Sequence, residues 1–453
     1  MIELLPYQKE DVARIEGYDG RILNALEMGL GKTLETLWVL KNNPQWLPAL
    51  VICPASLKFN WKHEASKHFG MESTVCEGKT PPKDSQFSFD FSTPLTIINY
   101  DILRNWIPWL KTRGFKTVVC DEIQAVQNSR TIRTKAVKEI SGWVKHLMML
   151  SGTPLSNRPA ELFPTLNMLW PKEYPSFTAF AHRHCKPRLT HWGWKYDGAE
   201  RLGELHEKLT RLGMIRRKKA DVLKDLPEKV RRIIPCEMSR PEEYHEASTH
   251  FIQWLKKNMA HRVRSASRAE ALTQIGYLLR LTAQLKIRTP IEWSNQFLEN
   301  TNEKLVIFGV HQKAIEAYCR RIERKYVMVD GSTNNQARHE AVQQFQSDPD
   351  TRVFIGSRTA WAGVTLTAAS TIAATELWWR PGDMAQMEDR IHRIGQKSVS
   401  FINYFVAADT IEERLCRIIQ EKQKVLSAVL DGGETPEDIN LYELLLDELQ
   451  ITL

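Results

Sequence analysis

The sequence predicts an α/β protein with two lobes, each a parallel sheet with helices on both faces, and a helical insertion between the lobes. Short apolar segments rich in β-branched residues recur in the first third of the chain and again after residue 303, and helical stretches follow them. Buried strands that alternate with helices are typical of doubly wound parallel sheets. Between the two regions strand signals nearly vanish, and charged sequence with a helical period replaces them.

Each predicted part of the chain has its own elements. The first lobe covers residues 1–165, with strands expected in 21–26, 49–54, 95–100, 116–122 and 146–152. The second covers 303–409, with strands expected in 304–309, 326–331, 352–357, 370–375 and 399–405. The helical, basic insertion and linker occupies 166–302. Residues 410–453 are predicted to form a C-terminal helix and an acidic tail that docks by its leucines.

The composition of the chain excludes several classes of protein. The chain has 453 residues, of which 42% are hydrophobic and 26% charged, a balance that excludes a largely disordered or collagenous protein. No stretch is apolar enough to span a membrane, and the start lacks the layout of a signal peptide. Its seven cysteines are scattered without metal-binding spacing. We therefore expect a soluble protein, nuclear or in the cytoplasm of a bacterial or phage-infected cell, with idle thiols and no structural zinc.

The positive charge is concentrated in the middle of the chain. The net charge is +8, from 62 Lys and Arg against 54 Asp and Glu, which favours a polyanionic partner. Basic residues cluster in 213–232 and 254–288, and the second segment contains Glu270 as its one carboxylate. Such a cluster is either a solvated helical face or a surface between the lobes that contacts phosphates.

A candidate nucleotide-binding loop lies at 26–33, where the sequence reads LEMGLGKT between an apolar segment and a helical stretch. Gly29 and Gly31 let the backbone turn its N–H groups toward a phosphate. Lys32 is expected to neutralise the phosphates, and Thr33 to ligate magnesium. Because Leu26 replaces the first glycine of the usual pattern, the alternative is a chance GKT between a strand and a helix.

Two adjacent carboxylates, Asp121 and Glu122, end the apolar segment KTVVC. A carboxylate pair at the tip of a buried strand is costly unless a cation shares it. We expect Asp121 to hold Mg²⁺ and Glu122 to orient and deprotonate the attacking water.

The second lobe carries QMEDRIHRIGQ at 386–396, in which Arg390 and Arg393 are three residues apart. That spacing would place both on one helical face. The functional interpretation is a pair of arginine fingers that reach the γ-phosphate. The alternative is an exposed helix in which these arginines pair with Asp389.

Together these motifs resemble helicase superfamily 2, and specifically the Swi/Snf-type ATPases that translocate on double-stranded DNA. LPYQ (5–8) resembles the adenine-reading Q motif, and CPASLKFNW (53–61), DEIQ (121–124) and LSGTPLSN (150–157) resemble motifs Ia, II and III. MIRRKKADVLKDLP (214–227) resembles a family signature, and HRIGQ is among the most specific strings. WGWKYDGAERLGELH (192–206) and ELWWRPG (376–382) resemble the distant subgroup that contains the annealing helicases.

The resemblance implies two RecA-like P-loop lobes with ATP and Mg²⁺ between them and a duplex across both. The implied nucleotide site consists of Gln8, Met28, Gly29, Leu30, Gly31, Lys32 and Thr33, with Thr33 and Asp121 as metal ligands. The residues implied to couple the ATP and DNA sites are Gln124, Ser151, Thr153 and Gln386. Those implied to contact DNA are Ser56, Asn99, Tyr100, Gly363, Thr365 and Trp379.

One motif departs from the family pattern. Where motif V has a run of glycines, this chain has Ala360-Trp361-Ala362-Gly363, so Gly363 alone permits a close backbone approach and Trp361 is expected to pack instead. Five of the fourteen tryptophans lie in apolar contexts and are expected in the core or at its rim, namely Trp38, Trp106, Trp109, Trp143 and Trp170, whereas Trp378 and Trp379 stay candidates for function.

The leading hypothesis is a monomeric, DNA-dependent ATPase that moves along double-stranded DNA without reading its sequence and remodels DNA or protein–DNA complexes. The first alternative is a remodeller of forked or branched DNA, or of R-loops, with annealing or unwinding activity and a task in DNA repair. A further alternative is a nucleotide-gated DNA-binding module that barely hydrolyses ATP.

Overall fold

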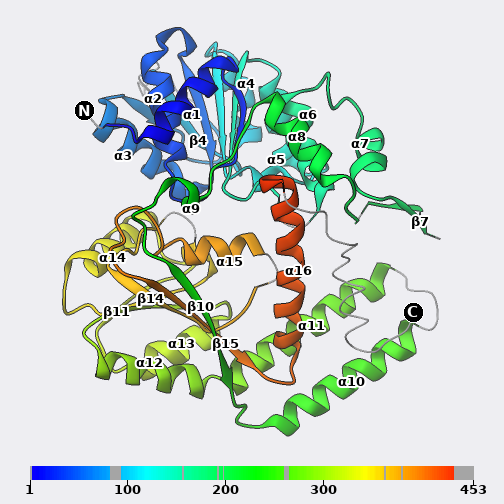
Figure 1. The fold of residues 1–453 in the computed structure, drawn as a ribbon, viewed down its shortest axis with the longest axis vertical. Coiled ribbons are helices and arrows are strands. Elements are labelled where there is room, and N and C mark those ends of the chain that lie inside the picture. The colour runs from blue at the N-terminus through cyan, green and yellow to red at the C-terminus, as the bar shows by residue number, and fades with distance from the viewer. Residues whose placement is uncertain are drawn as a thin grey trace. The chain divides into compact units, whose positions relative to one another are not determined.

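The computed structural model describes residues 3–81, 93–155, 158–190, 193–196, 198–259, 265–361, 364–378 and 381–432. These residues divide into two compact units (Figure 1). The first contains the chain up to Lys224 together with the end of the last helix from Lys424. The second contains Asp225 to Gln423. Since the division falls at Lys224, the segment 166–302 is shared between the units.

The first unit is built on a seven-stranded sheet in which every paired strand is parallel. Its order is β3-β4-β2-β5-β6-β1-β9. The strands are β1 (Arg21–Asn24), β2 (Ala49–Cys53), β3 (Ser73–Val75), β4 (Leu95–Asn99), β5 (Thr117–Asp121), β6 (His146–Leu150) and β9 (Met214–Ile215). All residues of β2, β4, β5 and β6 are buried, as expected for a sheet covered on both faces.

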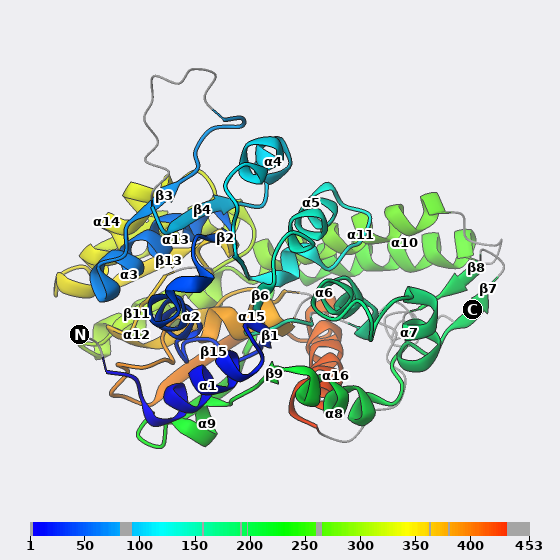
Figure 2. The ribbon, with the colours of Figure 1, turned by 90° about the horizontal axis from the view of Figure 1, so that it is seen from above.

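Helices cover both faces of this sheet, with α1, α2 and α3 on one side and α4, α5 and α6 on the other (Figures 1 and 2). These helices are α1 (Pro6–Gly17), α2 (Lys32–Asn42), α3 (Lys58–Phe69), α4 (Leu103–Lys111), α5 (Ile132–Ser141) and α6 (Phe163–Leu169). The unit continues with α7 (Phe177–His184), the antiparallel pair β7 (Arg188–Thr190) and β8 (Gly193–Lys195), α8 (Leu202–Leu212) and α9 (Lys219–Val222). Right-handed connections explain the two faces, because the chain moves one way across the sheet after β1 and the other way after β4.

The second unit is built on a six-stranded parallel sheet of order β10-β15-β14-β11-β13-β12. Its strands are β10 (Lys229–Cys236), β11 (Lys304–Phe308), β12 (Tyr326–Val329), β13 (Val353–Gly356), β14 (Ala369–Ala374) and β15 (Ser400–Ala407). Its helices are α10 (Pro241–Met259), α11 (Ser265–Leu285), α12 (Arg288–Asn300), α13 (Gln312–Arg321), α14 (Asn335–Ser347) and α15 (Pro381–Glu388), followed by α16 (Ile411–Asp431), which ends in the first unit.

Alternation along the central strand β11 creates two cores in this unit. Val306 and Phe308 join a cluster with α11, α14 and α15. Leu305 and Ile307 join a second cluster with α12 and α13. Because successive strand side chains point to opposite faces, a continuous apolar segment supplies both cores at once. The ten strands predicted from apolar segments are all confirmed.

One long strand falls where the sequence predicts helix. β10 pairs with β15 over all eight of its residues and forms an edge of the sheet. Four of its residues, Arg231, Arg232, Ile233 and Pro235, are exposed. An edge strand tolerates charged residues and the internal Pro235, so it lacks the continuous apolar pattern that predicts a buried strand.

Candidate active site

The nucleotide loop joins β1 to α2 in the first unit. Gly29 and Gly31 have φ angles of +83° and +93°, in the left-handed region that favours glycine. A Cβ atom on Gly31 would lie 2.4 Å from Nε2 of Gln8. Gly31 also precedes the first residue of α2, whose free N–H groups are suited to bind a phosphate.

Side chains hold the carbonyl groups of this loop. Lys32 Nζ donates to the carbonyls of Leu26, at 2.8 Å, and Glu27, at 3.2 Å. Burial lowers the pKa of Lys32, and the neighbouring carboxylates of Glu122 and Asp121 oppose that effect. The Lys32 amine is therefore hydrogen-bonded to the carbonyls of its own loop. The next residue, Thr33, is half-buried.

The first helix supplies further donors to the loop. Tyr7 Oη and Gln8 Nε2 both donate to the carbonyl of Leu30, at 2.8 and 3.1 Å. The backbone N–H of Leu5 donates to Oε1 of Gln8 at 3.0 Å. Gln8 is thus fixed beside the loop, and adenine recognition by Gln8 stays a prediction. Tyr7 was not identified from the sequence, because a single tyrosine in a helix has no distinguishing spacing.

Buried carboxylates lie behind the loop. Glu35 is fully buried and its Oε2 accepts a hydrogen bond from Asn24 Nδ2 at 3.1 Å. Burial, and then the charge of Asp11, raise the pKa of Glu35 well above its usual value. Asp11, also fully buried, accepts from Arg217 Nη2 at 2.9 Å. Sequence reasoning missed this cluster, which joins α1, α2 and the segment after β9.

The acidic pair lies at the carboxyl end of β5. Asp121 Oδ2 accepts from Trp61 Nε1 at 2.9 Å, and Oδ1 accepts from the N–H of Glu122 at 2.9 Å. Burial, followed by the charge of Glu122, raises the pKa of Asp121 to about 7. A buried carboxylate that resists ionisation beside a second one suits a bound cation, so the donor set fits Mg²⁺.

Three of the four predicted coupling residues, Gln124, Ser151 and Thr153, form a hydrogen-bonded chain with Glu122. Gln124 Nε2 donates to Glu122 Oε2 at 2.6 Å, and Ser151 Oγ donates to Gln124 Oε1 at 2.8 Å. The N–H of Thr153 donates to Ser151 Oγ at 3.0 Å. The structure therefore links the end of β5 to the end of β6 through the residues that the motifs singled out, while their coupling role stays a prediction.

Two predicted DNA contacts of the first unit have internal partners. Tyr100 is 4% exposed, and its hydroxyl donates to the carbonyl of Asp121 at 2.7 Å. Asn99 is 6% exposed and lies 3.5 Å from Asp101. Ser56 is half-buried beside α3. DNA contact at these three positions stays a prediction, and the structure gives the first two side chains a supporting role.

The two arginines of the second unit lie beyond the helix predicted to carry them, since α15 ends at Glu388. Arg390 is 7% exposed and donates to the carbonyls of Gln386, at 2.8 Å, and Val364, at 3.1 Å. Arg393 Nη1 donates to the hydroxyl of Thr365 at 2.8 Å. The prediction that both arginines share a helical face is therefore wrong, because they follow the helix. The alternative of an exposed helix is also wrong, because Arg390 is buried.

Two predicted DNA contacts, Gly363 and Trp379, fall outside the part of the chain that the structure describes, and the side chain of Trp361 is not described either. Trp378 is described: the guanidinium of Arg358 lies 4.4 Å from the centre of its ring, and Trp378 packs against the core beside α14 and α15.

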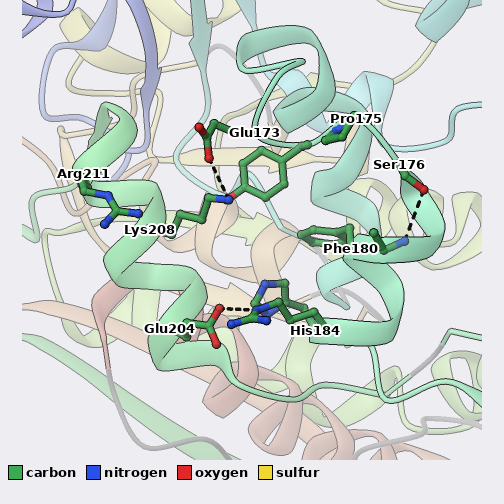
Figure 3. A pocket seen from close by; sticks show the side chains of 11 residues that line it. Glu173, Pro175, Ser176, Phe180, His184, Glu204, Lys208 and Arg211 are labelled. Carbon is green, nitrogen blue, oxygen red and sulfur yellow. Dashed lines mark hydrogen bonds and ion pairs between the residues drawn. The ribbon is translucent and has the colours of Figure 1, made fainter.

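Many basic residues of the middle segment have carboxylate partners. Lys286 is 1% exposed and bonded to Glu412 at 2.6 Å. Arg183 contacts Glu204 and Lys208 contacts Glu173 at a pocket of about 380 Å³ in the first unit. Figure 3 shows this pocket from close by. Internal pairing of this kind reduces the charge available for phosphates, which the sequence alone could not show.

Fold and site together define the class of protein. A glycine loop before a helix, with a lysine over it and an acidic pair at the end of a second strand of the same sheet, is the arrangement of a P-loop nucleoside triphosphatase. Residues 13–287 match the SNF2-related domain and residues 289–395 match the helicase conserved C-terminal domain. The chain belongs to the SNF2-related family, the helicase-like ATPases of superfamily 2.

Known proteins of the family resemble the chain along most of its length. It is 32% identical to human DNA annealing helicase and endonuclease ZRANB3, over 95% of this chain and 40% of that protein. It is 33% identical to the Xenopus laevis SWI/SNF-related matrix-associated actin-dependent regulator of chromatin subfamily A-like protein 1, over 93% of this chain and 44% of that protein. The chain therefore spans less than half the length of these relatives.

A solved structure also resembles the chain: the Sulfolobus solfataricus SWI2/SNF2 ATPase core in complex with dsDNA. The TM-score is 0.45 at 24% identity, over 95% of this chain and 94% of the other. Among the helices of the described residues, none is both long and apolar enough to cross a membrane. All seven cysteines are free thiols, and five of them are buried.

Proposed function

We propose that the chain is a DNA-dependent ATPase motor that moves along double-stranded DNA by contacts to its backbone and remodels DNA or protein–DNA complexes. The observation that carries the proposal is the hydrogen-bonded chain from Glu122 through Gln124 to Ser151. It joins Glu122, the group that we propose activates water, to the motif that follows β6, as a motor that couples hydrolysis to movement requires.

In this mechanism the loop before α2 binds the phosphates through its N–H groups and Lys32. Thr33 and Asp121 would hold Mg²⁺, which would neutralise charge on the phosphates. Glu122 accepts a proton from the attacking water, and Gln124 holds the carboxylate in place for that step. Arg390 and Arg393 are proposed to complete the site from the second unit, with Gln386 holding Arg390 through its carbonyl.

ATP turnover measured without nucleic acid and with double-stranded DNA, single-stranded DNA, forked DNA or RNA tests the proposal. We expect the largest stimulation with double-stranded DNA, and displacement of a third strand from a triplex without unwinding of the duplex. Turnover that does not rise with any DNA would contradict the proposal.

The variant Glu122→Gln separates a motor from a nucleotide-gated switch. It keeps the size of the side chain and its contact with Gln124 but cannot take the proton. A motor is expected to lose turnover by about 10² or more while still binding ATP. A variant that keeps strand displacement without turnover would support the gated module instead.

A second candidate function is the remodelling of forks or R-loops by strand annealing. Its support is the 32% identity to a protein named as a DNA annealing helicase. Annealing of two complementary strands coated with a single-strand-binding protein would favour this function, and net unwinding of a forked duplex would favour a helicase. Neither product is expected from a pure duplex translocase.

A further inference from the structure

The family signature segment after β9 lies directly beside the nucleotide loop. The N–H of Ala25 donates to the carbonyl of Ile215 at 2.8 Å, and the N–H of Glu27 donates to the carbonyl of Arg217 at 3.1 Å. Farther along, the N–H of Lys219 donates to Glu27 Oε2 at 2.5 Å. The backbone of this segment therefore continues the sheet as far as the start of the loop.

Arg216 in this segment bridges the loop and the last helix. Its Nη1 donates to the carbonyl of Ala25 at 2.8 Å, and its Nε donates to Asp431 Oδ1 at 2.8 Å. The side chains of Arg216 and Asp431 are 14% and 11% exposed, so water screens their contact poorly. Arg216 is also near enough to Lys32 to affect the pKa of that amine. Burial is the main cause that lowers the pKa of Lys32, and the charge of Arg216 lowers it too.

Asp431 stands at an unfavourable place in its own helix. It is the last residue of α16, where the partial negative charge of the helix end repels a carboxylate. Cations compensate there: Arg216 is bonded to Asp431, and Lys218 Nζ lies 3.4 Å from its Oδ2. The ring of His206 contacts the carbonyl of Val429 at 3.0 Å. This helix end is therefore fixed at a basic site next to the loop.

Four carbonyls in the loop and just before it accept hydrogen bonds from side chains. The carbonyl of Ala25 accepts from Arg216, those of Leu26 and Glu27 from Lys32, and that of Leu30 from Tyr7 and Gln8. When side chains hold the carbonyl groups of a loop on one side of its backbone, the N–H groups of the loop can face a phosphate on the other side. Lys32 has to leave its two carbonyls to reach a phosphate, so Arg216, Tyr7 and Gln8 are the donors that stay.

We propose that Arg216 is a positioning residue for the ATP-binding loop, and that Asp431 at the end of α16 fixes the orientation in which Arg216 holds the carbonyl of Ala25. Arg216 acts through the loop and does not touch the reacting atoms. The proposal rests on ATP binding by this loop, as in the proposed function, and does not depend on DNA.

The test uses the variants Arg216→Met and Asp431→Asn and the double variant. For each, the Kd for ATP is measured without DNA, and KM and kcat are measured at saturating duplex DNA. Loss of a hydrogen bond from a charged donor corresponds to an increase of about tenfold in Kd for Arg216→Met. We expect a smaller increase for Asp431→Asn, no further increase in the double variant, KM rising with Kd, and kcat changing less than about twofold. The matched control Arg183→Met removes an exposed arginine from a carboxylate elsewhere in the unit and should leave Kd unchanged.

Arg216→Met with wild-type Kd and KM would overturn the proposal for Arg216. Effects of the two substitutions that multiply in the double variant would overturn the link to Asp431. If Arg216→Met does not fold, Arg216→Lys replaces it in the test. One ammonium cannot reproduce the two separate donors of the guanidinium, so the Kd for ATP should still rise. An unchanged Kd would show that the charge alone matters and would overturn the positioning role. Wild-type protein that fails to bind ATP would contradict the proposed function instead.

Discussion

At the scale of single residues, the nucleotide loop depends on Gly31. Gly31→Ala places a methyl group 2.4 Å from Gln8 Nε2 at a φ of +93°, so the loop and Gln8 must both shift. We expect a loss of about 1–3 kcal/mol in unfolding free energy and weaker ATP binding, measured by thermal unfolding and by titration.

Gly17→Ala is the matched control for that variant, because its new methyl group meets no atom within 4 Å. It should leave ATP affinity unchanged and cost less than about 0.5 kcal/mol. Equal losses of ATP affinity at the two positions would show that the geometry of the loop is not the cause.

Gln124 is the second position at which a single side chain can be tested. Gln124→Met removes both of its hydrogen bonds, to Glu122 and Ser151, at similar size. We expect kcat for duplex-stimulated turnover to fall about tenfold or more while the Kd for ATP stays unchanged, because the loop itself is intact. The exposed Gln45→Met serves as the control, and a parallel rise in Kd would instead indicate damage to the nucleotide site.

At the scale of elements, one buried carboxylate ties the edge strand β10 to α15. Glu388 contacts Lys229 at 2.8 Å, Arg231 at 2.6 Å and the Tyr404 hydroxyl at 2.6 Å. Although burial acts against ionisation, the charges of Lys229 and Arg231 prevail and lower the pKa of Glu388 to about 2. Because the pKa is depressed on folding, this stabilisation is present above the ordinary value of 4.5 and is lost as the pH falls toward about 2.

Glu388→Gln should therefore lower the unfolding free energy by about 3 kcal/mol at pH 7, since it removes the charged partner of Arg231 and leaves the half-buried Lys229 with the longer contact to Asp389, at 3.5 Å. The difference from wild type should shrink as the pH falls below 4.5. Glu292→Gln removes an exposed partner of Arg288 and should cost less than about 0.5 kcal/mol. A Glu388 effect that is independent of pH would indicate lost packing rather than lost charge.

The elements also show why some predictions failed. Continuous apolar segments identified the central strands, because burial on both faces imposes that pattern locally. β10 escaped because an edge strand carries charges, and its partner β15 is remote in sequence. The helix predicted for Arg390 and Arg393 ends at Glu388, and the carbonyl of Val364 and the hydroxyl of Thr365 hold the arginines instead.

At the scale of the whole molecule, the net charge of +8 leads to a prediction about DNA. Binding that neutralises several phosphates releases counterions, so affinity for duplex DNA should fall by about 10³ or more between 50 and 200 mM salt. Fluorescence anisotropy on two unrelated duplexes measures the slope. Similar slopes for both sequences are expected, whereas a flat response or a strong sequence preference would contradict contact through the backbone.

Taken by itself, the sequence determined the two-unit α/β architecture, the nucleotide loop, the acidic pair and the family. These features depend on local patterns, namely strand periodicity and short motifs whose chemistry requires fixed spacing. The tertiary structure decided which groups support them: Tyr7 and Arg216 on the loop carbonyls, Asp431 on Arg216, and Lys286 on Glu412. The physical reason is that burial and pairing depend on residues far apart in the chain, and no local pattern encodes them.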